Sequence, residues 1–397
     1  MIREGYKMTE LGEIPQEWEV RKIEDLYSVL TGATPLRGKQ EYYLNGNVAW
    51  VKTLDLNDRY IYDTQEKITD LALKETSCKV QDEGTVLIAM YGGFNQIGRT
   101  GILKTKAATN QAICSLPLIE EIYPEYLNYF LIKNRNVWRN VAASTRKDPN
   151  ITKGDVEKFN IIVPPLSEQY KIADILSTID EQIDKTDALI EKTRELKKGL
   201  MQKLLIKGIG HTEFRDTEIG RIPKGWEVKK LEEIVQICYG KNQKEVEIEG
   251  GIYKILGTGG VIGNTNDYLW DKPSVLIGRK GTIDKPMYIE EPFWTVDTLF
   301  YTKVDEGYVA KWLYYYLNKI DLKKYNEATG VPSLSVAVLN TILILVPPFK
   351  EQQKISKILS AVDSDIDVYE SKKNKLENAK KALMNHLLTG KIRVLVQ

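Results

Sequence analysis

The side chains best suited to bind a ligand gather in glycine-rich loops in two separate parts of the chain. One such loop, Tyr91-Gly-Gly-Phe-Asn-Gln-Ile-Gly-Arg99, follows a predicted strand. Arginine can pair with guanine N7 and O6, asparagine and glutamine can pair with adenine N6 and N7, and lysine, serine and threonine can hold phosphates. The composition predicts contact with double-stranded DNA, although any one polar loop is more often a solvated turn.

Both parts place a Gly-Arg turn and clusters of Asn, Gln and Thr in the same order, which favours DNA binding over unrelated turns. The leading base-contacting residues are Asn95, Gln96 and Arg99 in the first part and Arg279, Lys280 and Thr282 in the second. The full predicted set of the first part is Arg37, Lys39, Tyr91, Gly92, Gly93, Asn95, Gln96, Arg99, Asn110, Gln111, Ser144, Thr145, Arg146 and Lys147. The full predicted set of the second part is Lys241, Asn242, Gln243, Lys244, Thr258, Asn264, Arg279, Lys280, Thr282, Thr298 and Ser333.

No pattern typical of catalysis accompanies these loops. The only two histidines, His211 and His386, lie outside both parts, which leaves little for histidine-based proton transfer. The chain has no G-x-x-x-x-G-K-[ST] phosphate loop and no His, Cys, Asp or Glu set at metal-ligand spacing. Its V-P-P-L and V-P-P-F segments lack the polar residue and the aromatic residue of the N-P-P-Y motif of adenine methyltransferases. We therefore expect a non-catalytic chain with no cofactor or metal of its own.

Composition narrows the class of protein further. The 397 residues, 42% of them hydrophobic, suffice for two or three domains with real cores. Three widely spaced cysteines predict a reducing cytoplasm, and the absence of a long apolar run predicts no membrane association. The net charge of +1 excludes a uniformly basic DNA-coating protein, so we expect any DNA-binding surface to arise from segregated charge.

The elements that must position the loops are written twice in the sequence. The segment that begins V-P-P-L-S-E-Q-Y-K-I at Val163 returns as V-P-P-F-K-E-Q-Q-K-I at Val346, and the repeat stays ungapped to Ile209 and Ile392, an offset of 183 throughout. Because one inserted residue would turn every later side chain by about 100°, an ungapped repeat is typical of a long helix. We predict one helix over 166–205, capped by Ser167 and about 60 Å long at 1.5 Å per residue.

Each helical repeat carries an apolar seam with alternating steps of four and three residues. Two such helices would bury their seams against each other, whereas the run Asp363, Asp365 and Asp367 is predicted to be a solvated face. The periodicity alone is equally compatible with a plain coiled-coil spacer. The predicted seam residues are Ile172, Leu176, Ile179, Ile183 and Ile190 in the first repeat, and Ile355, Leu359, Val362, Ile366 and Leu376 in the second.

A second repeat fixes the organisation of the whole chain. The segment 9–26, T-E-L-G-E-I-P-Q-E-W-E-V, returns over 217–234 as T-E-I-G-R-I-P-K-G-W-E-V at an offset of 208. Duplication on this scale predicts pseudo-two-fold symmetry, and the dissimilar middle regions look like the replaceable parts. In the first middle region we predict strands over 47–52 and 84–91 and a core helix over 118–138.

The duplicated I-P-x-x-W, the duplicated P-P-x-x-E-Q-x-K-I and the terminal L-L-T-G-K-I-R-V together resemble the specificity (S) subunit of type I restriction-modification systems. The resemblance covers nearly the whole chain. It implies an α+β protein in which two α/β target-recognition domains, 1–162 and 210–345, are separated by two conserved helical regions, 163–209 and 346–397, that form an antiparallel coiled coil. It also implies as partners double-stranded DNA, two methyltransferase (M) subunits with S-adenosylmethionine, and restriction (R) subunits with ATP and Mg²⁺.

The function that the resemblance implies is recognition of a bipartite, asymmetric DNA site, one half for each recognition domain. We expect the helices to act as a ruler between half-sites whose centres lie about one helical turn, roughly 10 base pairs, apart. Two alternatives remain at this point. One is a coiled-coil scaffold that binds only proteins, and the other is a self-sufficient DNA-modifying enzyme, which the missing motifs disfavour.

Overall fold

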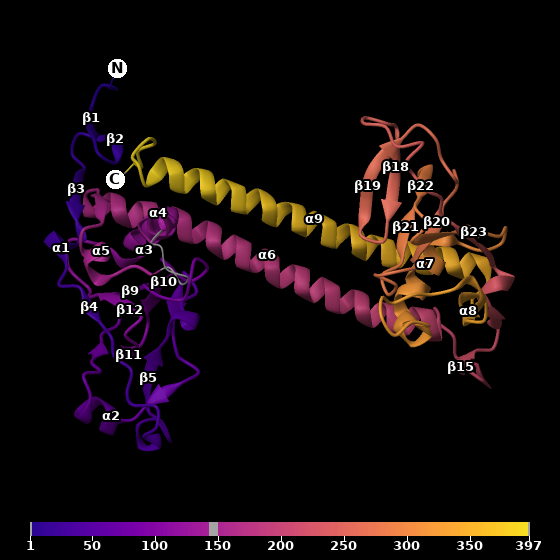
Figure 1. Cartoon of the computed structure of the whole chain (residues 1–397), viewed down its shortest axis with the longest axis horizontal. Helices are drawn as coiled ribbons and strands as arrows, with labels where there is room; N and C mark the ends of the chain where they lie inside the picture. The colour runs from indigo at the N-terminus through magenta and orange to yellow at the C-terminus, as the bar shows by residue number, and fades with distance from the viewer. Residues whose placement is uncertain (1, 143–149, 396–397) are drawn as a thin grey trace. The chain divides into compact units, whose positions relative to one another are not determined.

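The computed structural model describes residues 2–142 and 150–395, apart from the side chain of residue 139. The chain divides into two compact units (Figure 1). Unit 1 comprises Met1–Lys185 and Lys373–Gln397, and unit 2 comprises Thr186–Lys372. Each unit therefore contains one mixed α/β domain together with part of each long helix, so the unit boundaries fall inside the helices.

Unit 1 contains two small sheets with the strand orders β4-β12-β9-β10-β6 and β7-β5-β11-β8, a hairpin β1-β2, and the pair β3-β13. Its strands are β1 (Tyr6–Thr9), β2 (Gly12–Pro15), β3 (Glu19–Lys22), β4 (Leu30–Thr31), β5 (Val48–Val51), β6 (Tyr60–Ile61), β7 (Lys67–Ile68), β8 (Val80–Gln81), β9 (Val86–Ala89), β10 (Thr100–Leu103), β11 (Ala107–Thr109), β12 (Ile113–Leu116) and β13 (Asn160–Val163). Its helices are α1 (Ile23–Leu26), α2 (Asp70–Glu75), α3 (Pro124–Lys133), α4 (Arg135–Val141) and α5 (Lys153–Glu157), together with the first half of α6 (Leu166–Lys207) and the last part of α9 (Phe349–Leu387).

Unit 2 repeats this order with the sheets β17-β23-β20-β21 and β19-β18-β22, a hairpin β14-β15, and the pair β16-β24. Its strands are β14 (Phe214–Thr217), β15 (Gly220–Pro223), β16 (Glu227–Lys230), β17 (Val235–Tyr239), β18 (Tyr253–Gly257), β19 (Gly260–Thr265), β20 (Ser274–Gly278), β21 (Met287–Ile289), β22 (Phe293–Thr295), β23 (Leu299–Val304) and β24 (Leu343–Val346). Its helices are α7 (Ala310–Lys319) and α8 (Val336–Asn340), together with the second half of α6 and the first part of α9 (Phe349–Leu387).

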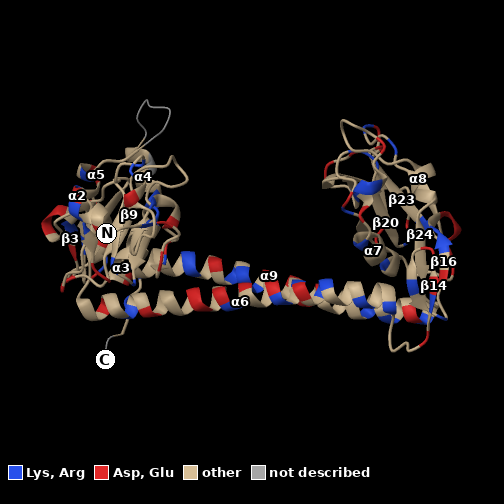
Figure 2. Cartoon of the chain, turned by 90° about the horizontal axis from the view of Figure 1, so that it is seen from below, with Lys and Arg blue, Asp and Glu red and all other residues tan. Residues whose placement is uncertain are grey.

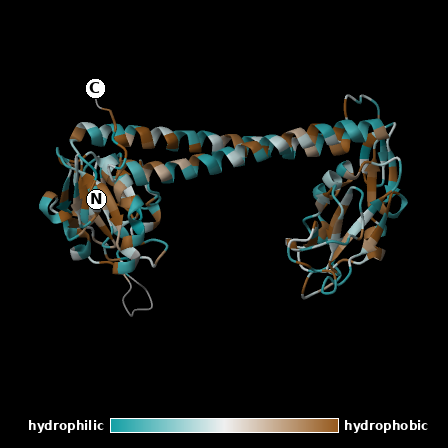
Figure 3. Cartoon of the chain, turned by 90° about the horizontal axis from the view of Figure 1, so that it is seen from above, coloured by the Kyte–Doolittle hydropathy of each residue, from teal (hydrophilic) through white to brown (hydrophobic). Residues whose placement is uncertain are grey.

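The two domains share most of their strand order, although β6 and β8 of unit 1 have no counterpart in the sheets of unit 2. β5 and β11 pair in parallel in unit 1, as β18 and β22 do in unit 2, and the order β4-β12-β9-β10 matches β17-β23-β20-β21. Hydrophobic segments follow the strands inside each domain (Figure 3), and the tryptophans Trp18, Trp50, Trp138, Trp226 and Trp312 are fully buried. The internal duplication predicted from the sequence is confirmed, as are the strands predicted over 47–52 and 84–91.

The predicted start of the first long helix at Leu166 is confirmed, whereas the predicted cap of that helix and the predicted start of the core helix are wrong. The core helix expected over 118–138 begins only at Pro124 and is divided into α3 and α4, because proline fits the first helical position while it holds the preceding Tyr123 in an extended conformation. Ser167 is not a cap: α6 begins at Leu166, so Ser167 is an exposed residue of the first turn.

The repeated motifs fasten each domain to the start of its long helix. In unit 1, Trp18 Nε1 donates to Glu168 Oε1 at 3.2 Å, and the Gln169 side chain donates to Pro164 O at 2.9 Å while it accepts from Tyr123 N at 2.8 Å. In unit 2, the matching contacts are Trp226 Nε1 to Glu351 Oε2 at 3.0 Å, Gln352 to Pro347 O at 2.9 Å, and Val309 N to Gln352 at 2.9 Å. The distant Trp and Glu-Gln motifs are therefore one structural unit.

The long helices are paired and antiparallel. Within unit 2, Arg194 contacts Glu370 at 2.7 Å and Lys197 contacts Asp363 at 2.5 Å, so residue numbers rise along α6 as they fall along α9. Seven of the ten predicted seam residues are buried, and Ile179, Ile366 and Leu376 are half-buried. Asp363 is not part of a solvated face as predicted, because Lys197 and Tyr315 cover it, whereas Asp365 and Asp367 are exposed.

Candidate nucleic-acid interface

Loops of unit 2 that are distant in sequence converge where β20 ends, at one end of the strands of the β17-β23-β20-β21 sheet, which we call the loop edge of unit 2. Arg279 N and Lys280 N donate to Thr298 O at 2.8 and 3.3 Å, and Leu334 N donates to Arg279 O at 2.9 Å. Lys280 also forms a bridge with Ser333. Four of the predicted residues, Arg279, Lys280, Thr298 and Ser333, therefore lie together on three connected segments.

Arg279 is the best-positioned arginine of this edge. Its Nη1 donates to Asp297 O at 3.1 Å, and its guanidinium carbon lies 5.3 Å from the centre of the Tyr239 ring. The side chain is half-exposed, while Lys280 and Thr282 are exposed. The aromatic ring and the carbonyl hold the guanidinium in one orientation, which suits the planar, two-point contact that arginine makes with guanine.

The β18-β19 hairpin borders the same edge. A Cβ at Gly281 would lie 3.9 Å from Thr258 Oγ1, which places the turn of the hairpin beside the loop after Arg279. Leu256 pairs with Val261 and Ile255 with Gly263, so Ile262 is an extra residue in the ladder. This bulge leaves both Val261 and Ile262 exposed, at 58% and 50%. Asn264 is half-buried on β19, and its carbonyl accepts a hydrogen bond from Ile248 N at 2.9 Å.

Sequence reasoning did not select Val261 and Ile262, because apolar residues were expected in cores. The signal that would have identified them is the apolar pair between glycines in T-G-G-V-I-G-N-T, a segment otherwise composed of turn and polar residues. An exposed aliphatic pair on a ribbon can contact the C5-methyl group of thymine. We therefore add both residues to the candidate interface.

The segment 241–244 also borders this edge, and it carries mixed charge. Lys241 N donates to Thr295 O at 2.8 Å, Trp294 Nε1 donates to Lys241 O at 2.9 Å, and Asn242 Oδ1 accepts from Lys244 N at 3.0 Å. Glu245 and Glu247 follow directly and are exposed, as are Lys241 and Lys244, while Gln243 is half-buried. Basic and acidic residues alternate along much of the chain (Figure 2), and the segregation of charge on a DNA-binding surface stays a prediction.

In unit 1 the predicted loop joins β9 to β10 and is held by its backbone. Gly98 N donates to Ala89 O at 2.9 Å, and the fully buried Ile97 anchors the loop. Gly92 and Gly98 have φ of +112° and +72°, which side-chain-bearing residues rarely adopt. Tyr91, Gly92 and Asn95 are exposed, and Gly93, Gln96 and Arg99 are half-exposed. Gln96 Oε1 is buried without a hydrogen-bond partner among the described residues.

The remaining predicted residues of unit 1 already have partners. Arg37 pairs with Glu66, and its guanidinium carbon lies 4.7 Å from the Tyr43 ring and 4.9 Å from the Trp50 ring. Lys39 pairs with Glu75, Gln111 Oε1 accepts from Thr34, and Asn110 Oδ1 accepts from Ala112 N at 3.1 Å. Ser144, Thr145, Arg146 and Lys147 lie outside the described residues.

The two Gly-Arg turns are not structural counterparts, although the sequence suggested that they were. Ile151 N donates to Met90 O, and Leu334 N donates to Arg279 O, in the same place of the two domains. Likewise Met90 N donates to Ala112 O, as Arg279 N does to Thr298 O. Met90 therefore occupies the position of Arg279, and Arg99 lies at the opposite end of its loop. The two domains present arginine from different positions, because the loop after β9 is longer.

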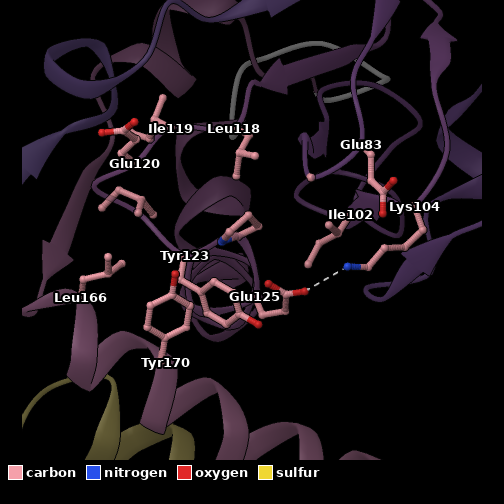
Figure 4. Close-up of a pocket in the computed structure, with 13 residues that line it drawn as sticks. Glu83, Ile102, Lys104, Leu118, Ile119, Glu120, Tyr123, Glu125, Leu166 and Tyr170 are labelled. Atoms are coloured by element: carbon pink, nitrogen blue, oxygen red, sulfur yellow. Dashed lines mark hydrogen bonds and ion pairs between the residues drawn. The ribbon is translucent and has the colours of Figure 1, made fainter.

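One hollow of unit 1 lies away from these loops. A pocket of about 700 Å³ is bordered by the starts of α3 and α6 (Figure 4). Tyr123 and Tyr170 line it with ring centres 4.3 Å apart, and Lys104 Nζ contacts Glu125 Oε1 at 3.4 Å on its wall. None of the residues predicted to bind DNA lines it. The candidate interface therefore consists of exposed loops at the ends of strands and not of a pocket.

The part of the chain that the structure describes contains no group of three or more His, Cys, Asp or Glu side chains able to hold a metal ion. Cys78, Cys114 and Cys238 are free thiols, and burial raises the pKa of Cys114 to about 12, so that this thiol is a packing residue. Within residues 2–142 and 150–395, no helix has the length and apolar character needed to cross a membrane.

Comparison with known proteins identifies the family. The model of the type I restriction modification DNA specificity domain matches residues 15–194 and again residues 223–378. The chain belongs to this family, and the two matches correspond to the two halves of the internal repeat.

Curated relatives align over nearly the full chain. The type I restriction enzyme MjaVIII specificity subunit of Methanocaldococcus jannaschii is 30% identical over 98% of this chain and 96% of the relative. The MjaIX specificity subunit of the same organism is 26% identical, again over 98% of this chain and 96% of the relative. The EcoprrI specificity subunit of Escherichia coli is 24% identical over 88% of both chains.

Solved structures share the fold. A crystal structure of the type I restriction-modification system S subunit from M. genitalium superposes with a TM-score of 0.63 at 20% identity, covering 96% of this chain and 97% of that chain. A chain from a study of complex assembly and conformational transition of the type I R-M system superposes with a TM-score of 0.58 at 16% identity, covering 96% and 99%. Both likenesses extend over two domains and both long helices.

Proposed function

We propose that this chain is the non-catalytic DNA-recognition subunit of a type I restriction-modification complex, in which each recognition domain reads one half of a bipartite, asymmetric site. The observation that carries the proposal is the contrast between a constant frame and variable loops. The hydrogen bond from Trp to Glu and the backbone contacts of the adjacent Gln are the same in both units. The loops at the corresponding ends of the sheets differ in length and in residue type. A protein that reads two different half-sites requires this combination.

In this proposal, the edge of unit 2 reads bases through Arg279, Lys280 and Thr282, and through thymine contacts of Val261 and Ile262. In unit 1, Asn95, Gln96 and Arg99 take the corresponding role from the β9-β10 loop. Backbone amides and lysines hold phosphates and carry no sequence information. Methylation and cleavage belong to partner subunits, which would supply S-adenosylmethionine, ATP and Mg²⁺.

The test is a selection experiment. The chain is co-expressed with its methyltransferase partner, the complex is purified, and bound fragments are selected from a random DNA library at two salt concentrations. We expect a split, asymmetric motif with one gap length, and an affinity that falls steeply with salt because bound phosphates release counterions. A stable complex that enriches no motif, with binding indifferent to salt, would support a protein-binding scaffold instead.

The ruler role of the helices is tested separately. One heptad is inserted at matched positions of both helices, after Thr186 and after Tyr369, which correspond in the repeat. The insertion adds about 10 Å to each helix at 1.5 Å per residue. We expect the preferred gap to lengthen while the base preferences of both half-sites are retained. An unchanged gap would contradict the ruler.

A further inference from the structure

Each unit contains the same three-residue cluster where its domain meets both long helices. In unit 1, Asp180 of α6 accepts from Tyr129 Oη of α3 at 2.8 Å and contacts Lys380 Nζ of α9 at 2.6 Å. In unit 2, Asp363 of α9 accepts from Tyr315 Oη of α7 at 2.6 Å and contacts Lys197 Nζ of α6 at 2.5 Å. We call these the unit 1 cluster (Tyr129, Asp180, Lys380) and the unit 2 cluster (Tyr315, Asp363, Lys197).

The two clusters are related by the internal repeat. Asp180 corresponds to Asp363 in the helical repeat, and Lys197 corresponds to Lys380. The aspartate and the lysine exchange helices between the two units, as a pseudo-two-fold axis requires. Burial and the neighbouring carboxylate raise the pKa of Tyr129 and of Tyr315, so each hydroxyl stays protonated and donates. The contacts recur in both units, although the helix that carries the aspartate in one unit carries the lysine in the other. Incidental surface ion pairs would not recur in this way.

The position of the clusters along the helices suggests their role. Each helix is first fastened to its domain at Glu168 or Glu351, and the cluster aspartate follows further along the same helix, at the same interval in both repeats. That interval is about 18 Å along a helix. Apolar packing of Ile172 and Ile355 holds the stretch in between, and the cluster adds a directional polar contact at its far end, where a small rotation of the helix would move the partners apart the most.

We infer that the two clusters are positioning devices that fix the angle at which the helix pair leaves each recognition domain, and thereby the gap length that the subunit accepts between half-sites. The link to gap length rests on the proposed function, whereas the angle of the helices concerns the geometry of each unit alone. The cluster residues do not contact bases. They act through the direction of the helices on which the domains are mounted.

The two units are not fastened equally. In unit 1, Arg59 adds a third joint, because its guanidinium contacts both Asp180, at 3.2 Å, and Asp184. The counterpart of Asp184 in unit 2 is Asp367, which has no ion-pair partner among the described residues. The adjacent hollow measures about 500 Å³ in unit 2 against about 270 Å³ in unit 1. The unit 2 cluster, whose aspartate side chain is 29% exposed against 9% in unit 1, is the weaker point and the better one to test.

The first measurement needs no DNA. In the full chain with Cys238→Ser, spin labels are placed at Asp271→Cys in the domain and at Ser371→Cys on α9, both exposed positions of unit 2. Cys78 and Cys114 are buried, so they do not react. We expect a narrow distance distribution that broadens in Tyr315→Phe and in Asp363→Asn, and that Asp363→Glu restores in part. Asp365→Asn, an exposed neighbour on the same helix, is the matched control and leaves the distribution narrow.

The second measurement is the selection experiment with the same variants in the complex. We expect selectivity for one gap length to fall by roughly tenfold, the range for a lost hydrogen bond to a charged group, while base preferences within both half-sites stay unchanged. Unchanged distance widths in Tyr315→Phe and Asp363→Asn would overturn the inference, and Tyr315→Phe alone decides if Asp363→Asn does not fold. Broadened widths with an unchanged gap would overturn the link to gap length. A wild-type complex that selects no bipartite site would refute the proposed function, while the distance measurement would still decide the geometry.

Discussion

Unit 1 and unit 2 share the contacts that attach each domain to its long helix, which we call the frame, and differ in the loops of the domain. In both, a buried tryptophan donates to the glutamate at the start of a long helix, and a tyrosine of the core helix donates to an aspartate further along that helix. The loops differ: unit 1 has a long β9-β10 loop with Arg99 at its far end, whereas unit 2 has Arg279 directly after β20 and a bulged β18-β19 hairpin. The repeat therefore preserves the attachment of each domain to its long helix, whereas the loops at the ends of the sheets differ between the two units.

The largest expected effect tests whether the frames are equally important to folding. Ile172 and Ile355 are counterparts in the repeat, are at most 1% exposed, and belong to the cores of unit 1 and unit 2. We expect Ile172→Ala and Ile355→Ala each to lower the free energy of unfolding by about 3 kcal/mol, because each leaves a cavity in a packed core. Urea unfolding monitored by tryptophan fluorescence measures both. Leu196→Ala, at a 54% exposed position of α6, is the control and should change little.

The next effect separates the two frames. Glu168 is held by Trp18 and by Arg393, whose Nη2 lies 2.6 Å from Glu168 Oε1, and this pairing raises the pKa of Arg393. Glu351 is held by Trp226 and by His211, whose Nε2 lies 2.9 Å from Glu351 Oε1. We expect Glu168→Gln to cost about 2 kcal/mol and Glu351→Gln about 1 kcal/mol, since two guanidinium nitrogens contact the two carboxylate oxygens of Glu168, whereas a single ring nitrogen contacts Glu351. Equal losses in thermal unfolding would show that Arg393 and His211 stabilise their glutamates equally.

A smaller effect concerns the loops. Arg279→Ala removes the guanidinium that Tyr239 and Asp297 orient. We expect a loss of discrimination of about 2 kcal/mol at one base pair of one half-site, with the other half-site unaffected. Competition binding with single-substitution DNA sites measures it. Arg221→Ala, an exposed arginine of the β14-β15 hairpin, is the matched control. Retained discrimination would remove Arg279 from the set of base-contacting residues.

The smallest effect tests the hairpin that only unit 2 has. If Val261 and Ile262 contact thymine, replacing the thymines of the selected site by uracil, one position at a time, removes a single methyl group. We expect about 0.8 kcal/mol, or roughly fourfold weaker binding, at one or two positions. Val261→Ser should abolish that difference between thymine and uracil. Equal affinity of the two bases at every position would exclude both side chains from the interface.

Much of the frame could be predicted from the sequence, because helices and their seams depend on residues three and four positions apart. The heptads from Ile172 to Ile190 and from Ile355 to Ile366 identified α6 and α9, and both lie where the repeat placed them. The strands β5 and β9 followed from local β-branched and aromatic runs in the same way. The start of α6 at Leu166 also lies where the sequence placed it, whereas the start of α3 was missed, because Pro124 begins a helix that has no side-chain cap.

The tertiary structure alone decided which polar residues meet. Asp363 looks like one of three solvated aspartates until Tyr315 and Lys197, both distant from it in the sequence, close over it. Arg99 and Arg279 look equivalent until backbone hydrogen bonds from Ile151 and Leu334 show that Met90 is the counterpart of Arg279. The sequence by itself therefore determined the duplicated frame, because periodicity is local. Long-range contacts assigned the side chains to core, cluster or loop edge, because burial and hydrogen bonding depend on partners that sequence spacing does not reveal.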